Sequence, residues 1–190
     1  MKTTNIMIVG VGGQGSLLAS KLLGQLLVAE NYDVKVSEVH GMSQRGGSVV
    51  TYVKYGEKVS SPIICDGEAD FIVSFEKIEA ARWVSCLKTD GRVIVNTQQI
   101  DPMPVITGAA EYPEGALDEL AAAGVKVDAL DALTLADEAG SSKAVNIVLM
   151  GRLARYLDIP YERWIEEIEK AVKPKFIDIN KKAFELGYNA

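Results

Sequence analysis

Two glycine-rich segments contain the residue types in this chain that could do chemistry. The first, GVGGQG, sets Gly10, Gly12 and Gly15 in a G-x-G-x-x-G pattern, with Gly13 and Gln14 between them. Glycines at this spacing permit a tight turn and let a phosphate or a neighbouring backbone approach the N-terminus of a following helix. The pattern indicates a phosphate site, a partner contact, or only a tight turn from strand to helix.

The second segment, HGMSQRGG, contains the chain's single histidine and an arginine framed by glycines. Its residues are His40, Gly41, Met42, Ser43, Gln44, Arg45, Gly46 and Gly47. A guanidinium held in such a loop can donate two parallel hydrogen bonds to a phosphate or a carboxylate. The histidine has no nucleophile or partner acid in view in the sequence, so we expect a structural hydrogen bond for it rather than acid–base catalysis.

The elements around these segments predict that both lie at one edge of a sheet. Residues 6–10, IMIVG, form a continuous apolar run typical of a buried parallel strand, and leucines at helical spacing follow over 14–30. Strands over 34–39 and 48–56 flank the second segment, with no helix between them. Because α/β proteins bind ligands at the carboxyl edge of the sheet, we expect both segments to be exposed there.

The remaining elements predict the fold class. We expect strands over 69–75, 92–96 and 125–130, helices over 77–87, 116–123, 141–157, 161–172 and 180–187, a turn at Asp90–Gly91, and an irregular proline-containing excursion over 101–115. Strand–helix–strand order implies parallel crossovers. We therefore predict a single Rossmann-like three-layer α/β domain over 1–190, with a mostly parallel central sheet in a core of about 1–157 and a helical C-terminal extension over 158–190.

The first glycine segment also fits a dinucleotide-binding fingerprint. Glu38 lies 23 positions after Gly15, where an acidic residue would bond a ribose hydroxyl. Against this, a mononucleotide-binding half needs a helix between its second and third strands, and this chain has the second glycine segment there. A free-standing dinucleotide-binding oxidoreductase therefore remains one alternative, and a non-enzymatic interaction scaffold is another.

Composition excludes several classes of partner and site. With 20 Lys+Arg against 26 Asp+Glu, the formal charge of -6 disfavours binding to nucleic acid or to anionic membranes. No signal peptide and no apolar run of about 20 residues is present, so we expect a cytoplasmic protein. Cys65 and Cys86 form no C-x-x-C pair, and we expect two buried reduced thiols rather than a metal site.

Two polar features have structural rather than chemical expectations. Asn146 lies in the apolar run VNIVLMG, so if it is buried it should form a hydrogen bond to a nearby loop backbone. Asp66, Glu68 and Asp70 precede a strand within a turn, where solvent and capping roles suit them better than metal binding.

Several stretches resemble the gamma-type domain of 2-oxoacid:ferredoxin oxidoreductases, and among these enzymes the resemblance is greatest to small (beta) subunits of the indolepyruvate type. HGMSQRGG is the most specific stretch, because many other members have a shorter loop. The resemblance runs through residues 180–187. The matching stretches are GVGGQG at 10–15, EVHGMSQRGGSV at 38–49, SPII at 61–64, EADFIVSFEKIEAAR at 68–82, IVN at 94–96 and NIVLMGRL at 146–153.

The resemblance implies a subunit that is inactive alone. In such enzymes an aryl 2-oxoacid is oxidatively decarboxylated on thiamine diphosphate with magnesium, 4Fe-4S clusters pass electrons to ferredoxin, and the acyl group passes to coenzyme A. The thiamine and cluster sites belong to the large (alpha) subunit, so no cofactor is expected on this chain alone. The two glycine segments would then face the large subunit, with Arg45 close to the coenzyme A path. The apolar face of the 161–172 helix fits either this domain or a second chain, so homodimerisation of the isolated chain stays open.

Overall fold

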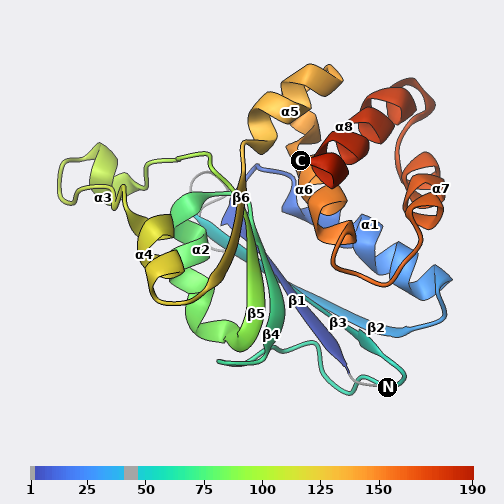
Figure 1. The fold of residues 1–190 in the computed structure, drawn as a ribbon, viewed down its shortest axis with the longest axis horizontal. Helices are drawn as coiled ribbons and strands as arrows, with labels where there is room; N and C mark the ends of the chain where they lie inside the picture. The colour runs from blue at the N-terminus through green and yellow to red at the C-terminus, as the bar shows by residue number, and fades with distance from the viewer. Residues whose placement is uncertain (1–2, 41–46) are drawn as a thin grey trace.

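A six-stranded sheet forms the centre of the molecule (Figure 1). The computed structural model describes residues 3–40 and 47–190, with the backbone alone at His40, so Gly41 to Gly46, including Arg45, lie outside the described residues. The strand order is β2-β3-β1-β4-β5-β6, and β3 alone runs antiparallel to its neighbours. The strands are β1 (Thr4–Val11), β2 (Asp33–His40), β3 (Ser48–Gly56), β4 (Ala69–Ser74), β5 (Leu87–Asn96) and β6 (Lys126–Leu130). The predicted mostly parallel sheet is confirmed.

Helices cover both faces of this sheet. Along β1, Ile6 and Ile8 point into one core, while Met7 and Val9 point into the other, because successive strand residues face opposite sides. One face carries α1 (Ser16–Ala29), α5 (Ala132–Ala139), α6 (Val145–Ala154), α7 (Tyr161–Ala171) and α8 (Ile177–Asn189); the other carries α2 (Lys77–Trp83) and α4 (Ala116–Ala122) (Figure 1). The three-layer prediction is confirmed.

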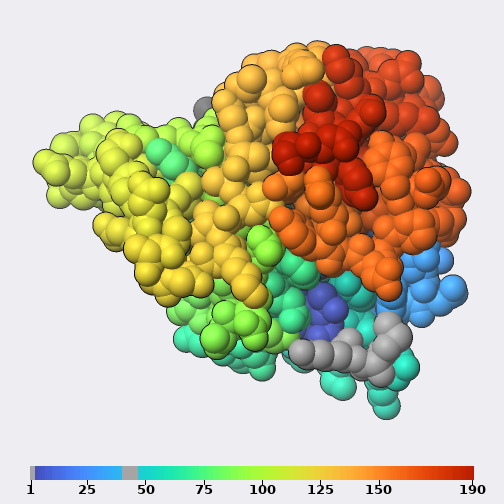
Figure 2. Space-filling view, viewed as in Figure 1, coloured from blue at the N-terminus to red at the C-terminus, as the bar shows by residue number. Residues whose placement is uncertain are grey.

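The C-terminal helices share the core of the sheet. Trp164 of α7 and Phe184 of α8 are fully buried, and their ring centroids lie 5.5 Å apart. Both belong to the same apolar cluster as residues of α1, α6 and β1. The segment around α3 (Met103–Ile106) instead projects from the body of the molecule, as the space-filling view shows (Figure 2).

Two glycines let α6 and α8 cross in backbone contact. A Cβ added at Gly151 would lie 2.2 Å from the carbonyl oxygen of Phe184, and one added at Gly187 would lie 2.0 Å from that of Val148. Neither distance can be relieved by moving a flexible side chain, because both neighbours are backbone atoms. Glycine at both positions is therefore required by the packing of the C-terminal helices.

The predicted turn at Asp90–Gly91 is wrong, because both residues lie inside β5. The pairing of β4 with β5 shifts register between Ala69 and Phe71, as at a β-bulge. A Cβ on Gly91 would lie 2.9 Å from the carbonyl oxygen of Ala69 and 2.7 Å from Leu87 Cδ1. The glycine thus marks a close approach of strands rather than a reversal of the chain.

The helix predicted over 141–157 is also corrected. It begins as a 3-10 turn (Ser142–Ala144), and its α-helical part, α6, ends at Ala154. An unpredicted helix, α5, precedes it, capped by the Asp131 side chain, which accepts from the Thr134 N–H (3.0 Å). Helix α2 is likewise shorter than predicted, because it ends at Trp83 and continues as a 3-10 turn.

The prediction that both cysteines are buried is wrong for Cys65, which lies in the link between β3 and β4. Cys86 is buried as expected, but Cys65 is exposed in this surface link, where its N–H donates to Glu68 Oε2 (3.0 Å). Asp70 lies inside β4 rather than in a turn before it, where it accepts from the Asn5 N–H (2.8 Å) and pairs with Lys88 (2.6 Å), so the predicted solvent or capping role does not describe this residue. Within the described ranges no helix has the length and apolar character that crossing a bilayer requires.

Gly151→Ala is predicted to lower the free energy of unfolding by at least about 2 kcal/mol, because the new methyl group forces α6 away from α8. Urea denaturation followed by circular dichroism measures this change. Gly24→Ala is the matched control. Its nearest contact would be an ordinary 3.5 Å to Val36, and the helix gains up to about 1 kcal/mol of propensity. Equal unfolding midpoints for the two variants would contradict the packing argument.

Candidate recognition site at the carboxyl edge of the sheet

The first glycine segment forms the turn from β1 into α1. A Cβ on Gly10 would lie 2.9 Å from Gln14 Oε1 and 2.9 Å from Phe75 Cβ, so the turn closes this tightly only around a residue with no side chain. Gly13 and Gly15 have φ of +97° and +87°, the left-handed region that favours glycine. Gly13 is exposed at the apex, with nothing within 4 Å of an added Cβ.

Gln14 turns inward and braces the turn. Its Oε1 accepts the Val11 N–H (2.7 Å), and its Nε2 donates to the Phe75 carbonyl (3.0 Å) and to Gln98 Oε1 (3.3 Å). These bonds join the carboxyl ends of β1, β4 and β5. Its carboxamide is thus committed to the fold rather than to an outside group, while the glycine backbones around it form the exposed surface.

Two buried asparagines extend the brace. Asn96, at the end of β5, donates to the Phe75 carbonyl (3.2 Å) and accepts the Ala132 N–H at the start of α5 (3.1 Å). Asn146 of α6 donates to the Gly15 carbonyl (3.4 Å), which confirms the predicted hydrogen bond to a loop backbone. Helices α1, α5 and α6 are thereby tied to the same edge.

The two glycine segments meet at this edge. The Gly12 N–H donates to the Gly47 carbonyl (3.0 Å), and the backbone of His40 pairs with Val49 across β2 and β3. Gly47, at one end of the second segment, therefore lies beside the first segment, whereas His40, at the other end, lies one strand further along the sheet. The roles predicted for His40, Gly41, Met42, Ser43, Gln44, Arg45 and Gly46 rest on side chains or residues outside the described part of the chain.

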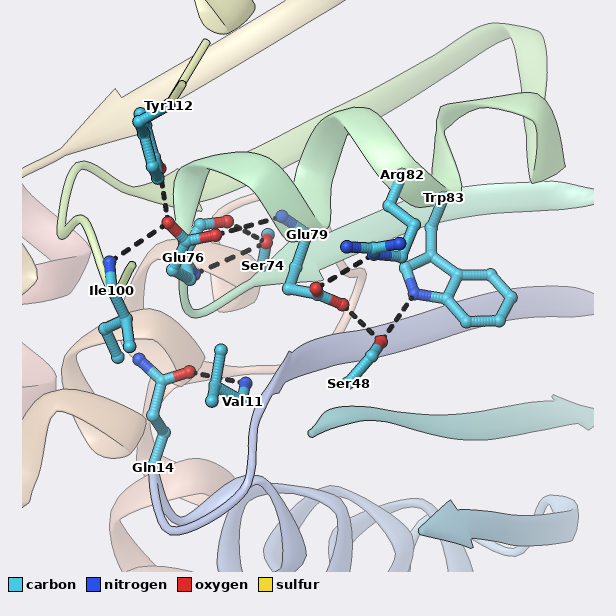
Figure 3. Close-up of polar contacts among 10 residues, drawn as sticks. All are labelled: Val11, Gln14, Ser48, Ser74, Glu76, Glu79, Arg82, Trp83, Ile100 and Tyr112. Carbon is cyan, nitrogen blue, oxygen red and sulfur yellow. Dashed lines mark hydrogen bonds and ion pairs between the residues drawn. The ribbon is translucent and has the colours of Figure 1, made fainter. Parts of the chain in front are cut away.

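Two buried glutamates lie next to this junction (Figure 3). Glu76 caps α2 by accepting the Glu79 N–H (3.0 Å), and its other oxygen accepts the Ile100 N–H (3.2 Å) and the Tyr112 hydroxyl. Glu79 accepts the hydroxyl of Ser48, the first residue of β3, and pairs with Arg82 (3.0 Å) (Figure 3). Both carboxylates thus have hydrogen-bond donors in place of water.

Tyr112 fastens the projecting segment to the sheet edge. Its burial and the hydrogen bond to the Glu76 carboxylate raise the pKa of the Tyr112 phenol above its ordinary value. The phenol therefore stays a donor over the physiological range, and residues 100–112 are tied to the N-terminus of α2.

The carboxyl edge of the sheet contains a small hollow among these carboxylates. A hollow of about 50 Å³ lies between the end of β1, Ser48, Glu76 and Arg82. The carboxylates around it are engaged in structural hydrogen bonds. In the described ranges no group of three His, Cys, Asp or Glu residues is arranged to hold a metal ion.

The sequence analysis did not predict a site role for four residues at this edge: Glu76, Glu79, Asn96 and Tyr112. Glu76 lies just after β4 and Asn96 ends β5, at the carboxyl ends of strands, which is the position where polar side chains of an α/β protein gather. Glu76 also stands directly before a helix, three residues ahead of Glu79, as N-capping side chains do. Tyr112 carried no local signal, because its partner lies 36 residues earlier.

The topology departs from a dinucleotide-binding half. Antiparallel β3 separates β2 from β1, so Glu38 lies on a strand roughly 10 Å from the glycine turn. Its Oε1 accepts a long hydrogen bond from Thr51 of β3 (3.5 Å). Glu38 is thus poorly placed to bond a ribose held at the first glycine segment.

Comparison with known proteins gives consistent matches along the whole chain. The family model described as pyruvate ferredoxin/flavodoxin oxidoreductase matches residues 5–190. Indolepyruvate oxidoreductase subunit IorB of Thermococcus kodakarensis is 46% identical over 197 aligned positions, covering 100% of this chain and 96% of that protein.

Two solved structures share the fold. The pyruvate oxidoreductase subunit PORC of Thermotoga maritima has a TM-score of 0.74 at 23% identity, covering 100% of this chain and 97% of that one. The 2-oxoglutarate:ferredoxin oxidoreductase of Magnetococcus marinus, solved with 2-oxoglutarate, coenzyme A and succinyl-CoA, has a TM-score of 0.75 at 18% identity. It matches 100% of this chain but only 31% of its own, so the same fold also occurs within a longer polypeptide.

Tyr112→Phe is predicted to lower the free energy of unfolding at neutral pH by about 1–3 kcal/mol, because a buried carboxylate loses a donor. A phenol with a raised pKa contributes its full stability below about pH 10 and loses it as the pH rises further. Denaturant titrations from pH 7 to 11 should therefore show a shallower loss above pH 10 in the variant. Tyr32→Phe is the control, and an identical pH slope for wild type and Tyr112→Phe would contradict the assignment.

Proposed function

Because this chain belongs to the pyruvate ferredoxin/flavodoxin oxidoreductase family, we propose that it is the small subunit of an indolepyruvate:ferredoxin oxidoreductase. The observation that carries the proposal is the 46% identity, over the full chain, to a protein named as such a subunit. Family membership confirms the resemblance noted in the motifs. In the complex, an aryl 2-oxoacid is oxidatively decarboxylated, the acyl group passes to coenzyme A and ferredoxin is reduced.

The redox cofactors of this reaction are assigned to the large subunit. A 4Fe-4S cluster takes four cysteine thiolates, and the chain has two cysteines, one exposed and one buried. The cysteines of this chain do not fit such a cluster. The proposed partner therefore supplies thiamine diphosphate, magnesium and the clusters. As a subunit of a ferredoxin-linked enzyme, the chain is proposed to act in the cytoplasm.

The chain's own contribution is a preorganised contact surface. The glycine turn is held by hydrogen bonds from Gln14 and Asn146, and the Gly12–Gly47 hydrogen bond joins it to the last residue of the second segment. A backbone surface fixed in this way loses little conformational entropy when a partner binds. We propose that the large subunit contacts this edge and that Arg45 lies close to the coenzyme A path, where a guanidinium suits phosphate.

Two alternatives make different predictions for purified material. A dinucleotide-binding oxidoreductase would bind NADH saturably as the isolated chain, which the position of Glu38 disfavours. An interaction scaffold would assemble with a partner but leave that partner's activity unchanged when both glycine segments are mutated.

Co-purification tests the proposed function directly. The tagged full chain, taken from its native host, should bring with it a large iron–sulfur thiamine protein. The eluate should reduce a viologen dye only when both indolepyruvate and coenzyme A are present. A lone inactive chain would overturn the proposal, and NADH titration would then test the first alternative.

Arg45→Ala is predicted to weaken assembly or to raise the KM for coenzyme A in the complex by about tenfold, the cost of losing one charge-assisted hydrogen bond. Native mass spectrometry and steady-state kinetics measure the two effects. Lys58→Ala, which removes a positive charge beyond the end of β3 at the opposite edge of the sheet, is the control. Unchanged assembly and unchanged coenzyme A dependence in Arg45→Ala would remove that residue from the site.

A further inference from the structure

A hollow of about 310 Å³ opens beside the glycine turn, between the start of α1, the turn that leads into α6, and the link from α7 to α8. That link contains a 3-10 turn (Pro174–Phe176). Leu18, Val172, Phe176 and Ile179 supply apolar walls, and none of them is fully buried. Apolar surface therefore remains available inside the hollow to a bound molecule.

Two lysines from different elements, Lys143 and Lys173, line this hollow. Lys143 belongs to the turn before α6, and Lys173 to the link after α7. No Asp or Glu is among the residues that line it, and within residues 3–40 and 47–190 neither ammonium has an ion-pair partner. In a chain of formal charge -6, this lysine-rimmed hollow is a local positive site.

The carboxamides that line the lysine-rimmed hollow add further donor capacity. Asn146 is buried, its oxygen accepts the Ile147 N–H (3.0 Å), and its nitrogen donates to Gly15 (3.4 Å). Asn180 donates to the Phe176 carbonyl (2.7 Å). Each amide nitrogen has two hydrogens, and the described residues provide an acceptor for one of them in each case. The lining thus offers donors and apolar surface, and it contains no anionic group.

We propose that the lysine-rimmed hollow binds a small carboxylate with an aromatic or branched aliphatic body. The carboxylate would lie between Lys143 and Lys173, and the body would pack against Leu18, Phe176 and Ile179. A volume near the lower end of the 300–1,000 Å³ range of ligand sites suits an acid of one or two rings. Inorganic anions would leave the apolar walls in contact with water. Every residue that lines the hollow belongs to this chain, so the isolated chain is expected to bind the acid.

The bound acid would contact the same segment that holds the glycine turn. Asn146 lines the lysine-rimmed hollow and also donates to the Gly15 carbonyl. The site is therefore adjacent to the carboxyl edge without being part of it.

Amide-detected NMR titration of the full chain tests the proposal, with phenylacetate and indole-3-acetate as probes. Saturable shifts are expected in residues 141–146 and 171–180. Acetate, which has no apolar body, and indole, which has no charge, should each bind at least about tenfold more weakly. Shifts centred on another part of the chain, or equal binding of acetate and phenylacetate, would overturn the proposal.

Substitutions separate the two halves of the site. Lys143→Gln with Lys173→Gln should raise the Kd for phenylacetate about tenfold, since two exposed charge contacts are lost. Phe176→Ser should also raise it, because an exposed apolar wall is removed without disturbing the core. Lys58→Gln is the charge control and should leave the Kd unchanged. A Kd unaffected by the double lysine variant would refute the assignment, whatever the outcome of co-purification.

Discussion

The arrangement of the carboxyl edge of the sheet depends on glycine at position 10, which has no side chain. Because no Cβ occupies that position, the Gln14 carboxamide can lie beneath the turn and reach Val11, Phe75 and Gln98 at once. The ends of β1, β4 and β5 are thereby held in one arrangement. A methyl group at Gly10 would displace both Gln14 and Phe75, and with them the turn on which the Gly12–Gly47 contact is built.

From this brace the structure extends outward through buried polar groups. Asn96 is hydrogen-bonded to the start of α5, and Asn146 of α6 is hydrogen-bonded to the glycine turn. The hydrogen bond between Tyr112 and Glu76 holds the projecting segment. Asn96, Asn146 and Glu76 are buried, and an unmade hydrogen bond is costly there, so the network favours one geometry over its alternatives. This backbone surface is the one that we propose the large subunit contacts.

Much of this architecture could be predicted from local sequence patterns, and the predictions that failed did so for physical reasons. Strand β3 was predicted at its observed bounds, since its apolar and β-branched run ends at glycines on both sides. The Asp90–Gly91 turn failed because the reason for Gly91 is a close approach to Ala69, about twenty residues earlier. Helix α5 was missed because its apolar face is built mainly from alanines, which give a weak periodic signal. The Glu76–Tyr112 pair depends on contacts between distant residues, which no short window of sequence contains.

Hydrogen–deuterium exchange of the full chain, free and in complex with the large subunit, tests the central claim most directly. The claim is that the carboxyl edge of the sheet is the surface that the partner covers. It predicts slower exchange on assembly in residues 12–18 and 40–50, with no change in residues 88–92 at the opposite edge. Protection confined to 88–92, with exchange at 12–18 and 40–50 unaltered, would contradict it.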